Sequence, residues 1–180
     1  MHADLQRLLD RDLTPDPAAV PLPDLRRIRN ACSDAEGDVS LTRRVVQGRL
    51  DIVGHELRRR SGSDDEAAPA PGVLYDIPEL LAEAGDRTAP PGRRRVGIGA
   101  PGAIAGTLLA EVDRIASPET LGSLDRLDTD ALRLLVDRLR DYETGLSETR
   151  RRLHDRIDVI QVEIARRYRD GEASVDSLLG

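Results

Sequence analysis

Apolar residues recur at helical spacings along two long stretches of the chain. The first stretch runs from Asp24 to about Arg60 without a proline, and the second from about Thr129 to Asp170. Their apolar positions are spaced by three, four or seven residues, the period of one face of an α-helix. We predict one long helix over 24–60, with Asp24 as its N-cap and a length of roughly 55 Å, and another over 129–170 that ends at Gly171.

Shorter elements surround these helices. Residues 1–23 form an arm with a short amphipathic helix around Leu5, Leu8 and Leu9, followed by a proline-rich break. Residues 61–102 are predicted to be a long flexible linker, with one short helical stretch at 77–84. Residues 103–128 contain two short helices, at about 103–116 and 118–127, the second capped by Ser117. Residues 171–180 form a tail.

The two long helices contain a repeat. With an offset of 107 residues, Glu36 aligns with Glu143, and the register holds without a gap through Arg60 and Arg167. Helical geometry predicts matching apolar positions, but most of the matches are polar. Ten pairs are identical: Glu36/Glu143, Ser40/Ser147, Thr42/Thr149, Arg43/Arg150, Arg44/Arg151, Arg49/Arg156, Asp51/Asp158, Glu56/Glu163, Arg59/Arg166 and Arg60/Arg167.

Each helix carries a polar stripe beside an apolar seam. At about 100° per residue, the polar residues of each repeat fall within roughly 80° of one another, and the seam lies roughly 80° away. The stripes are Glu36, Ser40, Arg43, Gln47, Asp51 and Glu143, Ser147, Arg150, His154, Asp158; the seams are Val39, Val46, Leu50, Val53, Leu57 and Leu146, Leu153, Ile157, Ile160, Ile164. We predict an all-α fold, an antiparallel coiled-coil hairpin of the two long helices, with both stripes facing a common cleft.

A third surface of the first helix is also apolar. Leu41, Val45 and Ile52 lie nearly opposite the seam and the stripe. Two interpretations stay open: the arm or the short helices cover this face, or it binds a partner protein.

Composition supports an all-α protein of one functional unit. The chain has no Trp or Phe, so its packing is built from aliphatic residues. All 27 basic residues are Arg, which a GC-rich genome explains more simply than selection for bidentate contacts. The net charge of −6 argues against direct DNA binding. With a single Cys32, no signal-peptide pattern and no membrane-length apolar run, we expect a soluble cytoplasmic protein.

The stripe of the first helix resembles a known ligand motif. Its spacing, E-x3-S-x2-R-x3-Q-x3-D, is similar to the cyclic di-GMP motif of the RsiG family of actinobacterial anti-sigma factors, and the second stripe repeats it with His154 in place of Gln. The twin copies resemble the type in which one chain supplies both helices of the coiled coil; a homodimer of single-motif chains is the other form. The resemblance covers about half of the chain.

The resemblance implies both a ligand and a partner. It implies that the ten stripe residues bind cyclic di-GMP as a pair of molecules, and that the loaded protein sequesters WhiG, the flagellar-type sigma factor of sporulation. The chemistry is compatible, because carboxylates accept the N–H donors of guanine, whereas Arg reaches guanine O6 and N7 or phosphate. Arg44 and Arg151 are secondary candidates for ligand contact.

Other functions have weaker support in the sequence. The three histidines show no metal-ligand spacing with Cys32, and no nucleophile lies beside a base, so we expect neither a metal site nor an enzyme. The alternative to the ligand-binding hypothesis is a coiled-coil adaptor that binds no small molecule, its stripes being solvated networks of ion pairs within each helix, such as Glu36 to Ser40 to Arg43.

Overall fold

The computed structural model describes residues 3–9, 16–62 and 102–171. Most of the predicted linker, with the helical stretch at 77–84, and most of the tail lie outside the described residues. In the part of the chain that is described, every regular element is helical.

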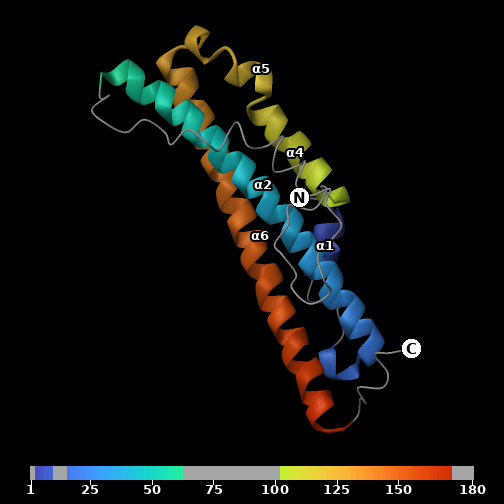
Figure 1. Ribbon diagram of the computed structural model, residues 1–180. Coiled ribbons are helices and arrows are strands. Elements are labelled where there is room, and N and C mark those ends of the chain that lie inside the picture. Colours follow the sequence, from blue (N-terminus) through green and yellow to red (C-terminus); the bar gives the residue numbers. More distant parts are fainter. Residues whose placement is uncertain (1–2, 10–15, 63–101, 172–180) are drawn as a thin grey trace, which may run out of the picture.

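Two long helices form an antiparallel hairpin, as the sequence predicts. They are α2 (Leu22–Ser61) and α6 (Thr129–Arg169), which lie side by side over most of their length (Figure 1). Arg43 of α2 contacts Glu143 of α6, whereas Glu36 contacts Arg150, so the residue numbers run in opposite directions. The predicted all-α helical hairpin is therefore confirmed.

The ends of the long helices follow from local chemistry, with one correction. Asp24 is not the N-cap of α2; the helix begins at Leu22, and Asp24 lies in its first turn, paired with Arg27. The early start is possible because Pro23 falls within the first turn, where its missing N–H has no helical acceptor. Gly62 and Gly171 adopt φ of 69° and 75° at the C-terminal ends, in the left-handed region that glycine tolerates.

The seam between α2 and α6 is the core of the hairpin. Val39, Val46, Val53 and Leu153 are fully buried, and Leu146 and Ile160 are nearly so. Two threonines are buried with them, Thr42 and Thr149, and each donates its hydroxyl proton to the carbonyl oxygen four residues earlier. These internal hydrogen bonds leave no unsatisfied polar group in the seam at either threonine.

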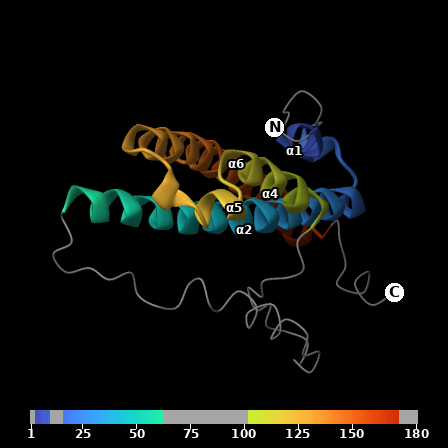
Figure 2. The same ribbon diagram turned by 90° about the horizontal axis from the view of Figure 1, so that it is seen from above.

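Shorter helices lie along the hairpin (Figure 2). They are α1 (Ala3–Leu9), α4 (Ala103–Ile115) and α5 (Pro118–Leu121), with two 3-10 turns, η1 (Pro17–Ala19) and η2 (Leu124–Arg126). The prediction of a single helix over 118–127 is wrong. Helix α5 ends at Leu121 and the 3-10 turn η2 follows, because the Ser123 hydroxyl donates back to the carbonyl of Glu119 while Leu124 turns into the core.

Helix α4 covers one flank of α2. Asp38 of α2 accepts hydrogen bonds from the N–H groups of Gly102 and Ala105, so it caps the N-terminus of α4 from a neighbouring helix. Val45 and Ile52 lie on this flank and pack against the core that α4 shares. All three residues suggested for partner binding are half-buried, and the protein itself covers part of Val45 and Ile52. None of the described helices is long and apolar enough to cross a lipid bilayer.

Two repeated arginines hold the ends of the hairpin together. Arg60, near the end of α2, donates to the carbonyls of Leu124 and Leu127, just before α6. Arg167, near the end of α6, donates to the carbonyls of Pro17, Ala18 and Val20, just before α2. Each arginine also pairs with the glutamate four residues earlier, Glu56 or Glu163. Since η1 and η2 are separated by the same 107 residues, the duplication extends beyond the long helices.

Replacing Arg167 with Ala is predicted to destabilise the protein by about 3 kcal/mol, because three carbonyl oxygens, one of them in a buried hydrogen bond, and Glu163 lose a charged donor. Chemical denaturation monitored by circular dichroism measures the change. Arg169→Ala is the matched control, because Arg169 is exposed two residues away, and its loss should change stability by less than about 0.5 kcal/mol. Equal stability of the two variants would contradict the role of Arg167 in holding the end of the hairpin together.

Candidate ligand-binding site

Eight of the ten stripe residues meet in a single polar row across α2 and α6. The row contains the Glu, Ser and Arg of both repeats, together with Gln47 and His154. Two half-sites make it up, and each takes residues from both helices.

In the first half-site, Arg43 of α2 reaches across to α6. Its Nε donates to Glu143 Oε1 at 2.6 Å and to Ser147 Oγ at 2.8 Å. Gln47 Nε2 donates to the same Glu143 oxygen at 3.3 Å, and the Ser147 hydroxyl donates to it at 3.0 Å. The carboxylate of Glu143 is thus the centre of this half-site.

The second half-site repeats the arrangement with the helices exchanged. Arg150 Nε donates to Glu36 Oε1 at 2.8 Å and to Ser40 Oγ at 2.9 Å. The Ser40 hydroxyl donates to Glu36 at 2.7 Å, and His154 Nε2 lies 3.3 Å from the same oxygen. His154 therefore stands in the position that Gln47 occupies in the first half-site.

The half-sites differ from the stripes expected from sequence. The contact from Ser to Glu within one helix is present, but each Arg pairs with the Glu of the other helix. A helical wheel cannot give this register, because it contains no information on how two helices are shifted along each other. Ion pairs between the helices therefore replace the chain of contacts within one helix.

Asp51 and Asp158 do not join the row. Both are exposed, and they lie at opposite ends of it. The antiparallel register separates them by about twenty residues of helical rise, or roughly 30 Å. The structure thus brings the Glu, Ser, Arg and Gln/His positions into one row of contacts, and leaves the two aspartates beyond it in opposite directions.

The row faces away from α4. On the α2 wheel, Asp38 and Arg49, which bond to α4, lie roughly 140–160° from Glu36. The guanidinium-bearing side chains of the row are partly open, with 34% of Arg43 and 41% of Arg150 exposed. A ligand can therefore approach these groups without displacing a described helix.

Both central glutamates are held in the ionised form. Burial raises the pKa of Glu36, but hydrogen bonds from Ser40 and Arg150 and the charges of His154 and Arg150 outweigh it, so the pKa lies below its ordinary value. Burial likewise raises the pKa of Glu143, and bonds from Arg43, Ser147 and Gln47 with the Arg43 charge lower it overall. The row thus presents two carboxylates and two guanidinium groups at neutral pH.

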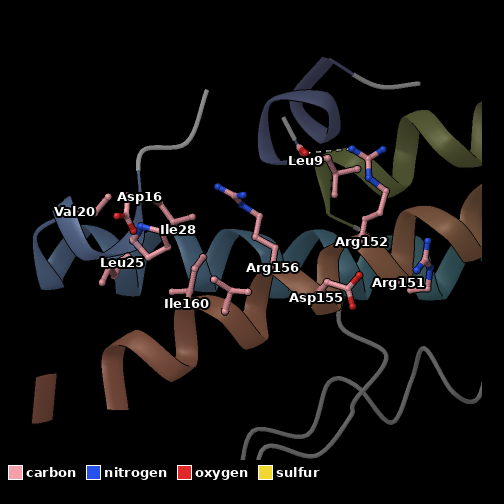
Figure 3. Close-up of a pocket in the computed structure, with 12 residues that line it drawn as sticks. Leu9, Asp16, Val20, Leu25, Ile28, Arg151, Arg152, Asp155, Arg156 and Ile160 are labelled. Atoms are coloured by element: carbon pink, nitrogen blue, oxygen red, sulfur yellow. Dashed lines mark hydrogen bonds between the residues drawn. The ribbon is translucent and has the colours of Figure 1, made fainter. Parts of the chain in front are cut away.

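The remaining candidates lie off the row. Arg44 donates to the carbonyl of Ser40 on its own helix, and Arg151 lines a groove between α6 and the first turns of α2 (Figure 3). No group of three or more His, Cys, Asp or Glu among the described residues is arranged to hold a metal ion. The buried Cys32, whose thiol pKa is raised by burial, lies in the core beside Arg156.

Comparison with known protein families gives a match over most of the chain. The model of a protein family described as RsiG-like matches residues 11–91 and 118–180, which include both long helices and all ten stripe residues. A search of curated proteins found no significant match to the chain.

The lowered glutamate pKa values predict acid sensitivity. A carboxyl whose pKa is lower in the folded state stabilises the fold at pH above its ordinary value of 4.5, and this stabilisation is lost as the pH falls through the folded value. The double variant Glu36→Gln, Glu143→Gln should therefore lose less thermal stability than the wild type between about pH 6 and about pH 3.

The control is Glu148→Gln, at an exposed position on α6 outside the row. Thermal unfolding followed by circular dichroism measures the difference. If the double variant showed the same pH dependence as the wild type and the control, the row would not hold ionised carboxylates.

Proposed function

Because the chain belongs to the RsiG-like family, we propose that it binds cyclic di-GMP at the polar row. The family suggests an anti-sigma factor role, and a regulatory rather than an enzymatic protein. In this proposal, two ligand molecules occupy the two half-sites. The hairpin with bound ligand then sequesters a WhiG-like sigma factor of the flagellar type and represses the transcription that this factor directs. The observation that carries the proposal is the pair of matching half-sites, each built from both helices.

The symmetry of the row supports this ligand. Cyclic di-GMP consists of two identical halves, each with a guanine and a phosphodiester. The two half-sites contain the same Glu, Ser and Arg, related by the exchange of α2 and α6. A symmetrical ligand, or a symmetrical pair of ligands, therefore meets equivalent groups at both ends.

The donor and acceptor chemistry of the row also fits guanine. A carboxylate accepts from guanine N1–H and N2–H, and a guanidinium donates to O6 and N7 or to a phosphate. The chain has no Trp or Phe to stack on a base. Guanidinium planes or neighbouring guanines must supply that stacking, which favours two mutually stacked ligands between the helices. Asp51 and Asp158 lie beyond the two ends of the row and are not part of it.

Binding requires an exchange of partners within the row. In the structure, Arg43 and Arg150 are paired with Glu143 and Glu36. Ion pairs that are partly exposed contribute only about 0–1 kcal/mol each, whereas hydrogen bonds to charged groups contribute about 1.5–3 kcal/mol. Replacing each pair by ligand contacts to both members is therefore favourable overall.

An adaptor that binds no ligand is the second candidate. The observation in its favour is that the row already satisfies its own charges, with each Arg and Glu paired across the seam. In that case the row would serve only to fix the register of the hairpin. Calorimetry with cyclic di-GMP separates the two functions, because an adaptor gives no binding heat.

Isothermal titration of the wild type is predicted to give two cyclic di-GMP molecules per chain. Arg43→Ala should weaken binding by about 10- to 100-fold, since it removes one charge-assisted contact. The matched control is Arg44→Ala, the neighbouring arginine that lies off the row. Unchanged affinity in the Arg43 variant would reject the assignment.

The proposal also predicts linkage between the ligand and the partner. If cyclic di-GMP bridges both helices and contributes to the partner surface, each ligand must raise the affinity for the other by the same factor. Titration of a purified flagellar-type sigma factor, with and without cyclic di-GMP, measures that factor. Equal sigma-factor affinity in both titrations would exclude the switch.

A further inference from the structure

The two half-sites of the polar row differ at one position. In the first half-site, Gln47 of α2 donates from Nε2 to Glu143 Oε1 at 3.3 Å. In the second, His154 of α6 places its Nε2 at the same distance, 3.3 Å, from Glu36 Oε1. Both side chains occupy the same position of the repeat, and each faces the glutamate of the other helix. The exchange of Gln for His therefore changes the chemistry of one half-site and preserves the rest of its arrangement.

The two side chains differ in how many hydrogen bonds they can donate. The amide nitrogen of Gln47 has two N–H groups, so it can donate one to Glu143 and the other to a bound ligand. Glu36 is held in the ionised form, and a carboxylate only accepts hydrogen bonds, so the His154 nitrogen that faces it carries a proton. A neutral imidazole has no further N–H, whereas an imidazolium has a second one on Nδ1. Protonated His154 is thus the form that matches both donors of Gln47.

The charge that the ligand brings favours this protonated form. The two glutamates and the two arginines of the half-sites cancel one another, whereas each cyclic di-GMP molecule carries two phosphodiester charges. Of the eight side chains of the row, His154 is the one that can gain a positive charge near neutral pH, because histidine exchanges its proton between about pH 5 and pH 8. An imidazolium attracts a nearby phosphate. Binding of the ligand and binding of the proton are then linked, and each raises the affinity for the other.

The surroundings of His154 permit this exchange. Its side chain is 46% exposed, so solvent protons and a ligand in the row can both reach it. Across the seam it faces Glu36, and one turn away on its own helix lie Arg150, Arg151 and Asp158. These two carboxylates and two guanidinium groups balance one another. The added phosphate charges therefore determine whether the imidazole takes up or loses a proton when the ligand binds.

We propose that His154 makes the second half-site a proton-dependent site, so that one of the two cyclic di-GMP molecules is bound more tightly below neutral pH than above it. The imidazolium donates from Nε2 to Glu36 and from Nδ1 to an acceptor of the ligand, which is a phosphate oxygen or guanine O6 or N7. The first half-site binds its ligand independently of pH in this range, because the Gln47 amide does not titrate. The inference rests on the proposed function and adds a regulation to it: as the pH falls, both half-sites fill at a lower ligand concentration.

Calorimetric titration with cyclic di-GMP between about pH 6 and about pH 8 tests the site. The pKa values of Glu36 and Glu143 lie below the ordinary value of 4.5, so both carboxylates stay ionised throughout this range. In the wild type, the affinity for one ligand should rise by about three- to tenfold from the upper to the lower pH, and the affinity for the other should stay constant. Titrations near neutral pH in two buffers with different heats of ionisation should show proton uptake on binding.

The half-sites themselves supply the matched variants. His154→Gln should bind cyclic di-GMP with an affinity that does not change over this pH range, and without proton uptake. Gln47→His places a histidine in both half-sites, so the pH dependence should extend to both ligands and the proton uptake should roughly double. The control is His55→Gln, which removes a histidine of α2 outside the row and should keep the pH dependence of the wild type.

The outcomes distinguish this inference from the proposed function. A wild type that binds cyclic di-GMP with the same affinity at every pH, or more tightly as the pH rises, would overturn the role of His154. PH dependence that persists in His154→Gln would overturn it as well. A wild type that binds no cyclic di-GMP at any pH would reject the proposed function, and this inference with it.

Discussion

The register of α2 against α6 is the constraint on which the site depends. The buried seam of Val39, Val46 and Val53 against Leu146, Leu153 and Ile160 fixes that register, and a shift of one helical turn would expose part of it. With the seam in place, Arg43 comes opposite Glu143 and Arg150 opposite Glu36. Hydrophobic burial thus positions polar groups whose own pairing energy is too small to do so.

Duplication gives the hairpin its approximate two-fold symmetry, and the function proposed here uses both the symmetry and its exceptions. The half-sites of the row are equivalent except for Gln47 and His154, which suits a ligand with two equal halves. The flanks are less equal: Asp38 caps α4, while the corresponding residue is Gly145. Asp113 likewise corresponds to Gln6. These exceptions lie on the flanks of the hairpin, outside the row.

The sequence predicts much of this fold for simple physical reasons. Apolar spacing gives the two long helices, and the absence of Trp and Phe agrees with a helix seam. The polar matches of the repeat pick out the residues of the row and also Arg60 and Arg167. The sequence could not show that each Arg crosses to the other helix, because a wheel describes one helix alone. Nor could the sequence separate candidate ligand residues from residues that hold the fold together. Asp51 and Arg60 are both repeated in the second helix, but the structure shows that Arg60 donates hydrogen bonds to the carbonyls of Leu124 and Leu127.

A double-mutant cycle on the free protein tests the central claim, that each half-site is built from both helices. The unfolding free energies of Arg43→Ala, Glu143→Ala and the double variant should reveal a coupling of about 0.5–1 kcal/mol. The same cycle with Arg43 and Glu36, which belong to the same helix and the same motif, should give a coupling close to zero. Coupling of Arg43 to Glu36 in place of Glu143 would contradict the account.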